Sequence, residues 1–297
     1  MDIVDLKKDY RKSGEGANGD SYDCVNDASF MLKMYNTVYP TEMIATELDI
    51  ARKVFSLGIP SPQPGDLVTD GERIGIRFQR IFGKRSFARM IADEPERTEP
   101  YTRMFAQYCR RLHSTQCPDG MFPDGISQAR NLLECDKVFT QDEKNVISTF
   151  IDSIPQCPTA LHGDMHMGNL ISTLPAGLPL TQEHTVNFID LGQFSRGCPL
   201  IDLGMMQIVC FHSDEGFRRE TFHLTGEQTQ AIWNIFVDEY FFSDDHLARY
   251  WFGPDATPQD VYDGILPYSC LKLFLIEFNC GALYPHFEKL IRQTFGL

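Results

Sequence analysis

The chain has 297 residues, 42% hydrophobic and 23% charged, which fits a soluble globular protein with a sizeable core and excludes collagen-like or disordered chains. Its formal net charge of −14 disfavours partners that are themselves anionic, namely nucleic acids and membrane surfaces. No signal peptide and no transmembrane run is expected. The nine cysteines form no C-x-x-C pair, which favours buried, reduced thiols in a cytoplasmic protein over disulfides or a zinc site.

The first third of the chain is predicted to be rich in β-structure. Short strands are expected at 21–26 and 29–34, joined by a turn at 26–27 and preceded by a glycine-rich stretch at 13–19. A helix is expected from Thr41, as its N-cap, to Leu57, before the break at Gly58 and Pro60. A hairpin is expected around 70–71, where Asp-Gly separates strands at 66–69 and 72–81.

The pattern changes near Gly83. Helices are predicted at 98–114, 127–136 and 141–154, and short strands and loops at 160–190. From Leu200 the chain is predicted to be mostly helical, with breaks near Gly226, Ser243, Gly253 and Pro285. These elements predict an α+β chain with a small β lobe at 1–82 and a larger, mainly helical lobe at 83–297. A cleft between two such lobes is a natural place for a ligand.

Two short motifs suggest a chemistry. LHGDMHMGN at 161–169 is followed about twenty residues later by FIDLG at 188–192, where an apolar strand precedes the aspartate. Transfer of a phosphoryl group to a hydroxyl needs one carboxylate that orients or deprotonates the acceptor. A second carboxylate and an amide oxygen can hold Mg²⁺. Asp164, Asp190 and Asn169 can supply these three groups in that order.

The motifs resemble those of aminoglycoside phosphotransferases and choline kinases, which are small-molecule kinases. In that family the loop reads H-G-D-x-x-x-x-N and the metal motif reads I-D, and both stand intact here at 162–169 and 189–190. The resemblance covers about residues 10–210 and implies a protein-kinase-like, two-lobed fold with a five-stranded antiparallel sheet and one helix over the nucleotide. It also implies that His162 and His166 support the loop rather than titrate in the reaction. His113 would be a packing residue, and Asp202-Leu203 would support the loop structurally.

The resemblance extends to the ion pair expected in the β lobe. Lys33, in the strand FMLKMY, resembles the lysine that contacts the α- and β-phosphates of ATP or GTP. Glu47, in the following helix, resembles its ion-pair partner. Asp49 and Glu42 lie close by in the sequence, so the choice of Glu47 among the three carboxylates stays open.

Two further stretches resemble nucleotide-binding segments of the family. Residues 14–20 stand where a phosphate-covering loop belongs, which makes Gly16 and Gly19 candidate contacts. Gln79 and Ile81, around the end of the second hairpin, fall where the hinge between the lobes hydrogen-bonds adenine. The implied cofactors are therefore ATP or GTP together with Mg²⁺, and the implied enzyme class is a phosphotransferase with an alcohol group as acceptor.

Three other functions compete with this one. A metal-dependent hydrolase could use the alternating 162, 164 and 166 side chains as ligands, although the remaining histidines form no second cluster. A nucleotide-binding pseudokinase would have the same fold, but pseudokinases usually lose the very residues present here at 33, 164, 169 and 190. A protein kinase is disfavoured because Asp190 is followed by Leu-Gly and little room remains for a peptide-docking loop.

The acceptor is expected to be a small hydroxyl compound such as an aminoglycoside, an amino alcohol or a sugar. Beyond Asp190 acidic residues outnumber basic ones, and both tryptophans, Trp233 and Trp251, lie in this segment. Acidic and aromatic side chains together would suit an ammonium group, although a solvated acidic helix face is the simpler interpretation. The candidate carboxylates are Asp214, Glu215, Asp238, Glu239, Asp244 and Asp245.

Overall fold

The computed structural model describes residues 1–16 and 18–297, without the side chains of Asp245 and Asn279. The described chain divides into two compact units. Unit 1 comprises residues 1–85 and 170–193, and unit 2 comprises residues 86–169 and 194–297. The segment that carries Asp190 therefore groups with the N-terminal residues. The lobe boundary expected at residues 82 and 83 stays a prediction.

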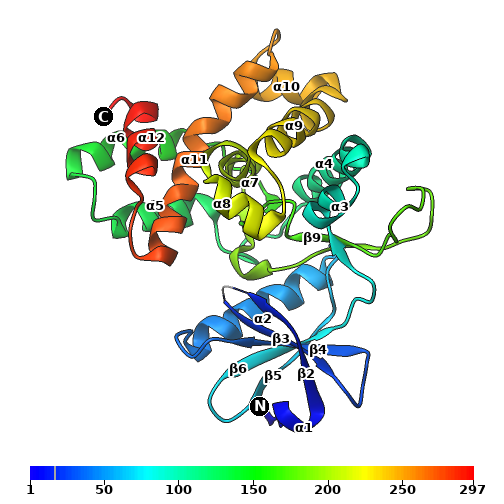
Figure 1. Ribbon diagram of the computed structural model, residues 1–297. Helices are drawn as coiled ribbons and strands as arrows, with labels where there is room; N and C mark the ends of the chain where they lie inside the picture. Colours follow the sequence, from blue (N-terminus) through cyan, green and yellow to red (C-terminus); the bar gives the residue numbers. More distant parts are fainter. Residues whose placement is uncertain (17) are drawn as a thin grey trace. The chain divides into compact units, whose positions relative to one another are not determined.

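Unit 1 is built on a six-stranded sheet with the strand order β1-β5-β6-β4-β3-β2 (Figure 1). The strands are β1 (Asp2–Ile3), β2 (Tyr10–Gly16), β3 (Gly19–Cys24), β4 (Phe30–Tyr35), β5 (Pro64–Thr69) and β6 (Ile74–Gln79). Every neighbouring pair is antiparallel except β1 and β5, which are parallel. The expected count of five antiparallel strands is therefore wrong. β1 is too short to show an alternating pattern, and β2 contains glycines that are typical of a loop.

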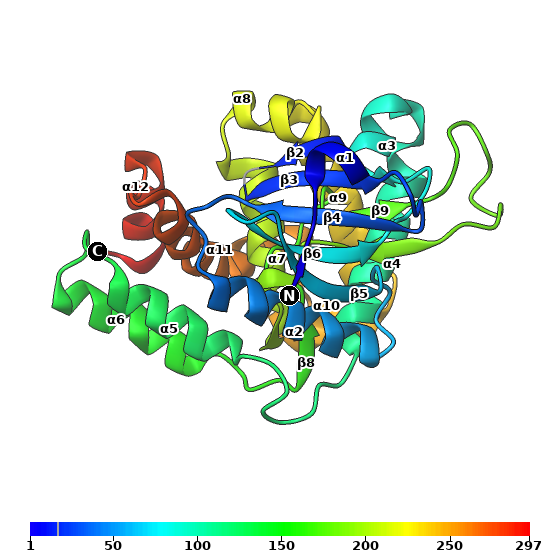
Figure 2. The same cartoon turned by 90° about the horizontal axis from the view of Figure 1, so that it is seen from below.

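One long helix packs on this sheet. After the short helix α1 (Leu6–Asp9), α2 (Thr41–Ser56) lies against the β5–β6 side of the sheet (Figure 2). Its Ile44 and Leu48 are buried with residues of β4 and β6 in one apolar cluster. The helix was expected to begin with Thr41 as N-cap, but the capping position is Pro40, which makes no side-chain cap. Pro40 is extended, with φ −63° and ψ 147°, so the last non-helical residue falls one position earlier.

Unit 1 is completed by a hairpin from the middle of the chain. β9 (Leu170–Ser172) and β10 (Val186–Phe188) pair antiparallel, with Phe188 opposite Leu170. Phe188 also donates its backbone N–H to the carbonyl of Pro60 at 2.8 Å, just beyond the end of α2. Asp190 follows β10 directly and precedes the short 3₁₀ turn η2 (Leu191–Gln193), so the fold fixes the end of the metal motif next to α2.

Unit 2 is mainly helical, which confirms the α+β class. β7 (Arg85–Ser86) crosses the division between the units. The further elements are α3 (Phe87–Asp93), η1 (Pro95–Arg97), α4 (Thr98–Ser114), α5 (Gly125–Cys135), α6 (Gln141–Ser153), β8 (Thr159–Leu161), β11 (Ser195–Gly197), α7 (Pro199–Gln207), α8 (Glu215–Phe217), α9 (Gly226–Val237), α10 (Asp245–Phe252), α11 (Pro258–Cys280) and α12 (Pro285–Phe295). Three π-helical turns, η3 (Ile208–His212), η4 (Arg218–Phe222) and η5 (Asp238–Phe242), continue α7, α8 and α9.

α7 and α11 lie side by side in the core of unit 2 (Figures 1 and 2). A Cβ on Gly204 of α7 would lie 2.7 Å from the backbone nitrogen of Ser269 on α11, so only glycine permits this approach. Ser269 Oγ in turn donates to the carbonyl of Gly204 at 3.1 Å. The two helices are thus held at close contact by backbone packing as well as by apolar side chains.

The cysteines and the helix lengths bear on two of the composition-based expectations. All nine cysteines are free thiols, and five of them are buried, as expected for small apolar side chains. Among the described residues, no helix combines the length and the apolar character that crossing a membrane would require.

Candidate active site

Lys33 is the centre of an ion-pair cluster in unit 1. Its Nζ lies 2.9 Å from Glu47 Oε1 and 2.7 Å from Asp190 Oδ1. Its side chain is 19% exposed and that of Glu47 16%, so this pair is largely shielded from water. Burial alone would lower the pKa of Lys33, but the carboxylates of Asp190 and Glu47 outweigh it and raise that pKa well above its usual value. Lys33 is therefore a fixed positive charge.

The structure distinguishes Glu47 from the two neighbouring carboxylates that the sequence left open. Asp49 is exposed and pairs instead with Lys53 on the same helix, at 2.6 Å. Glu42 is exposed in the first turn of α2. A Cβ on Gly192 would lie 2.9 Å from Glu47 Oε2, so glycine at this position lets the turn after Asp190 approach the carboxylate. Glu47 is thus fixed by Lys33 on one side and by η2 on the other.

Asp190 has an unusual backbone conformation. Its φ of 56° lies in the left-handed region, which side chains other than glycine, asparagine and aspartate rarely adopt. Such conformations cluster at active sites and ligand-binding segments. The side chain is 50% exposed. One carboxylate oxygen contacts Lys33, so Asp190 is both anchored and accessible to solvent.

The glycine-rich stretch forms the tip of the β2–β3 hairpin. Gly16 ends β2, Gly19 begins β3, and the two are paired across the hairpin. A Cβ on Gly19 would lie 2.0 Å from the carbonyl oxygen of Met34, so no other residue fits this close to β4. Asn18 accepts from the backbone N–H of Asn36 at 3.0 Å, which ties the tip to the end of β4. Ala17, inside the expected phosphate loop of residues 14–20, lies outside the described residues.

The expected hinge residues lie at and beyond the end of β6. Gln79 is the last residue of β6, and its backbone N–H donates to the carbonyl of Gln63 at 2.9 Å. Arg80 donates its backbone N–H to Ser29 at 2.7 Å, which continues the pairing toward β4. Ile81 follows, half-buried, where the chain leaves the sheet. Whether Gln79 and Ile81 bind adenine stays a prediction.

The second cluster is the loop at 162–169 in unit 2. Asn169 donates through Nδ2 to Asp164 twice, to Oδ2 and to the backbone carbonyl, each at 3.0 Å. His166 Nε2 lies 3.5 Å from Asp164 Oδ2, and its Nδ1 accepts from the backbone N–H of Gly168 at 3.0 Å. His162 Nδ1 accepts from the backbone N–H of Asp164 at 3.3 Å. Both histidines therefore support the loop, in agreement with the resemblance.

The carboxyl group of Asp164 is kept ionised by these neighbours. Burial would raise its pKa, but His166, and further His162 and Lys272, lower it below its usual value. The side chain remains 37% exposed. Asp164 is therefore a charged, accessible acceptor of hydrogen bonds, which is the property required of a group that orients a hydroxyl.

Asp202 braces this loop from α7. It is fully buried, and its two oxygens accept the backbone N–H groups of His162 at 2.6 Å and Gly163 at 2.8 Å. His113 Nε2 lies 3.1 Å from Asp202 Oδ2, and its Nδ1 lies 2.6 Å from the hydroxyl of Tyr240. Burial opposes ionisation of Asp202, but His113 and then Lys272 and His162 hold its pKa below the usual value. His113 is thus part of the brace and not only a packing residue.

Sequence reasoning missed one member of this cluster. Lys272, on α11, is 9% exposed and donates from Nζ to the backbone carbonyl of Gly163. Nothing in the local sequence LKLFLIEF distinguishes this lysine from one that extends along a helix surface to water.

The acidic residues considered as a site for a cationic acceptor already have partners in unit 2. Arg103 of α4 pairs with Asp238 at 2.9 Å and Glu239 at 3.0 Å. Arg110, also of α4, pairs with Asp244 at 3.2 Å. Glu215 pairs with Arg218 and Arg219, and Asp214 caps α8. The side chain of Asp245 lies outside the described residues. Trp233 is 3% exposed and belongs to the core.

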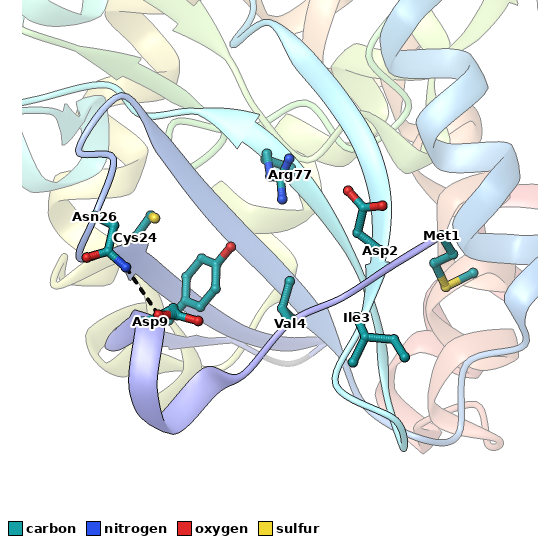
Figure 3. A pocket seen from close by; sticks show the side chains of 9 residues that line it. Met1, Asp2, Ile3, Val4, Asp9, Cys24, Asn26 and Arg77 are labelled. Atoms are coloured by element: carbon teal, nitrogen blue, oxygen red, sulfur yellow. Dashed lines mark hydrogen bonds between the residues drawn. The ribbon is translucent and has the colours of Figure 1, made fainter.

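A separate hollow of about 700 Å³ lies on unit 1, at the N-terminal strand (Figure 3). Asn26 Nδ2 donates to Asp9 Oδ1 at 3.1 Å across one side of it. None of the residues expected at the active site lines it. Its lining residues are Met1, Asp2, Ile3, Val4, Asp9, Tyr10, Cys24, Asn26 and Arg77.

The candidate metal ligands suit a magnesium ion. Asn169 uses its amide nitrogen for both bonds to Asp164, which leaves its Oδ1 directed away from them. Asp190 presents a half-exposed carboxylate. Hard cations such as Mg²⁺ prefer oxygen ligands, and Mg²⁺ usually binds one or two protein groups together with phosphates and water. In the described residues, no three His, Cys, Asp or Glu side chains gather as they would around a metal held by the protein alone.

Comparison with known proteins agrees with this arrangement. The model of a family described as the phosphotransferase enzyme family, APH, matches residues 9–234. No curated protein matches the sequence. Solved structures do match, and one is aminoglycoside phosphotransferase APH(3'')-Id from Streptomyces rimosus, in complex with ADP and streptomycin. It is 18% identical, with 88% of this chain and 92% of that chain covered and a TM-score of 0.50.

Two further structures cover nearly the whole chain. A thermostable mutant of aminoglycoside phosphotransferase APH(4)-Ia, in a ternary complex with ADP and hygromycin B, is 13% identical, with coverage of 96% and 94% and a TM-score of 0.58. A choline/ethanolamine kinase family protein from Mesorhizobium loti is 14% identical, with coverage of 97% and 85% and a TM-score of 0.51. The expected protein-kinase-like fold is thereby confirmed, and the family match confirms a phosphotransferase with an alcohol group as acceptor.

Proposed function

The chain belongs to the phosphotransferase enzyme family, and on that basis we propose that it is a small-molecule kinase. It transfers the γ-phosphate of ATP or GTP to a hydroxyl group of an aminoglycoside, an amino alcohol or a sugar. The observation that carries this proposal is that one largely shielded ammonium, that of Lys33, contacts both Glu47 and Asp190. A cation held in this way can bind phosphate oxygens without moving when charge shifts during the reaction.

Each residue of the two clusters has a role in this reaction. Lys33, fixed by Glu47, positions the α- and β-phosphates. Asp190 and Asn169 Oδ1 would hold Mg²⁺, which supplies positive charge to the phosphate oxygens when it is bound. Asp164 accepts the hydrogen bond of the acceptor hydroxyl, so that the hydroxyl oxygen faces the γ-phosphorus. As the new P–O bond forms and the bond to the β-phosphate oxygen breaks, the hydroxyl proton passes to Asp164 or to water, and the nucleoside diphosphate leaves.

The ligands of the structural relatives support a nucleotide as donor and a small hydroxyl compound as acceptor. Two of the structural relatives contain ADP, which supports a nucleotide as the donor. Those relatives hold streptomycin and hygromycin B, and a third belongs to a choline and ethanolamine kinase family, which supports a small hydroxyl compound as acceptor. Asp238, Glu239 and Asp244 already pair with two arginines of α4, so we base no preference for a cationic acceptor on the acidic excess of this segment.

The proposal is tested by measuring nucleoside diphosphate formation with Mg-ATP and with Mg-GTP. Amino alcohols, sugars, aminoglycosides and nucleosides are each added in turn, and the Asp164→Asn variant is the control. We expect at least one class to raise the rate well above that without acceptor, and the increase to disappear in the variant. If Mg-nucleotide bound but no class raised the rate, the chain would be a nucleotide-binding pseudokinase instead.

A further inference from the structure

Lys272 is the one lysine of α11, and its ammonium is turned into the core of unit 2. The side chain is 9% exposed, and Nζ donates to the backbone carbonyl of Gly163. Burial lowers the pKa of Lys272, and the carboxylates of Asp202 and Asp164 partly offset that effect. A buried lysine is costly to keep unless its ammonium has a specific partner. Here the partner is the peptide immediately before Asp164.

The peptide bonds on both sides of Gly163 are held by side chains. The backbone N–H of Gly163 donates to Asp202 Oδ1 at 2.8 Å. In the next peptide, the carbonyl oxygen of Gly163 accepts from Lys272, while the N–H of Asp164 donates to His162 Nδ1 at 3.3 Å. Gly163 itself has a φ of 86°, which glycine adopts at little cost. Because glycine has the freest backbone of all residues, the orientation of this turn depends on what holds its polar atoms.

The two helices that supply these side chains are fixed to each other. α7 carries Asp202, and α11 carries Lys272. Gly204 permits the close approach of the helices, and Ser269 Oγ bridges them through Gly204 O at 3.1 Å and Gln207 Oε1 at 2.6 Å. Asp202 and Lys272 therefore hydrogen-bond the Gly163 turn from two helices that are packed rigidly against each other.

We propose that Lys272 is a positioning residue of the catalytic loop, which acts by fixing the Gly163–Asp164 peptide and thereby the direction of the Asp164 side chain. The role rests on the proposed function, in which Asp164 orients the acceptor hydroxyl. A misplacement of a reacting group by about 1 Å can lower a rate about a hundredfold, so a hydrogen bond to this peptide can matter to turnover although Lys272 touches no substrate.

The matched control for Lys272 is Lys144. Lys144 on α6 is also partly buried, with a side chain 14% exposed, and its Nζ likewise donates to backbone carbonyls, those of Glu134 and Asp136 at the end of α5. It also lies 3.5 Å from the buried carboxylate of Asp136, so it represents a comparable lysine–carbonyl bond, with an ion pair in addition, away from the catalytic loop. Lys144→Met reports what loss of such a bond does to folding alone, and Lys272→Arg keeps a cationic donor at the loop.

The first measurement does not depend on activity. Amide hydrogen exchange is followed in the full-length Lys272→Met, Lys272→Arg and Lys144→Met proteins without ligand. We expect exchange in the peptide covering 161–170 to become at least tenfold faster in Lys272→Met only. Methionine is unbranched like lysine, is one atom shorter and needs no hydrogen-bond partner, so the variant should fold. If it does not, Lys272→Gln, whose side chain is too short to reach Gly163 O, replaces it with the same expectations.

The second measurement separates turnover from binding. The assay uses Mg-ATP and the acceptor class that is active in the screen. If no class is active, water serves as the acceptor. We expect kcat of Lys272→Met to fall at least tenfold, while KM for Mg-ATP changes less than twofold. Lys272→Arg should recover most of kcat. Unchanged exchange in 161–170, or an equal loss of kcat in Lys144→Met, would overturn the positioning role. If exchange in 161–170 became faster in Lys272→Met but the wild type showed no turnover, the result would count against the proposed function and not against the positioning role.

Discussion

Asn169 donates one side-chain amide group to both the carboxylate and the backbone carbonyl of Asp164, at 3.0 Å each. This pair fixes two of the proposed functional groups, which lie five positions apart in the sequence, relative to each other. The same bonds leave the amide oxygen for a metal, because they use only the nitrogen and the two atoms diverge from the amide carbon. The spacing in the H-G-D-x-x-x-x-N motif is thus explained by a direct hydrogen bond.

Replacing Asp164 by asparagine should lower kcat strongly and leave nucleotide binding nearly unchanged. Asparagine keeps the size of the side chain but removes the negative charge that orients the acceptor hydroxyl, and the loss is expected to be about 10²- to 10⁴-fold. Steady-state kinetics and calorimetry with Mg-ATP measure the two quantities separately. Asp152→Asn, in an exposed ion pair with Arg130, is a suitable control. Turnover close to that of the wild type would remove Asp164 from the mechanism.

Replacing Asp190 by alanine should weaken binding of Mg-nucleotide and abolish transfer. The carboxylate is lost both as a metal ligand and as a partner of Lys33, which contacts it at 2.7 Å. Calorimetry should therefore show that Mg²⁺ no longer strengthens nucleotide binding. Asp66→Ala, which removes an exposed partner of Arg52 on the same unit, should leave the magnesium effect intact. The metal assignment would be wrong if the magnesium effect survived in Asp190→Ala.

The partner of Lys33 can be identified by comparing two conservative variants of α2. Glu47→Gln removes the carboxylate that lies 2.9 Å from Lys33 Nζ, whereas Asp49→Asn removes one that pairs with Lys53 on the surface. We expect Glu47→Gln to lower kcat/KM for the nucleotide at least tenfold and Asp49→Asn to change it less than twofold. The result that contradicts this assignment is an equal effect of both changes, or a larger effect of Asp49→Asn.

Stability in mild acid should depend on His212. Burial lowers the pKa of His212 to about 4, with a smaller contribution from His286, and no hydrogen bond reaches its Nε2 in the described residues. The unfolded chain binds a proton near pH 6.5, so the free energy of unfolding falls as pH drops from about 6.5 to 4. His212→Phe should remove up to about 2 kcal/mol of the loss between pH 7 and 5.

Denaturant unfolding at both pH values measures this difference. The partly exposed His184, whose Nδ1 lies 2.7 Å from the carbonyl of Gln182, provides the control variant His184→Gln. The control should follow the wild type. An identical loss of stability in wild type and His212→Phe would show that the imidazole takes up no proton on unfolding in this range.

Local sequence patterns predicted correctly those helices and turns whose ends are marked by characteristic residues. The helix expected at 41–57 is observed as Thr41–Ser56, and the one expected at 98–114 is observed with those bounds. The Asp-Gly turn at 70–71 is confirmed, since Asp70 Oδ1 accepts the N–H groups of Glu72 and Arg73. These features depend on residues next to one another, so a single sequence reveals them.

Features that depend on residues far apart in the chain could not be predicted from local sequence patterns. β1 exists because Asp2 and Ile3 meet β5, more than sixty residues away. Proline usually interrupts a helix, yet α11 continues through Pro267, packed along α7. Lys272 acts on a carbonyl 109 positions earlier in the chain. Such contacts follow from tertiary packing, which overrides local propensity.

The most direct test of the central claim is mass spectrometry of the acceptor after incubation with the wild-type protein and the Mg-nucleotide that it consumes. The account predicts that the acceptor gains one phosphate group for each nucleoside diphosphate formed, and that neither product appears with Asp164→Asn. Nucleotide consumption with only inorganic phosphate as product, at the same rate in the presence and absence of every acceptor class, would contradict a small-molecule kinase.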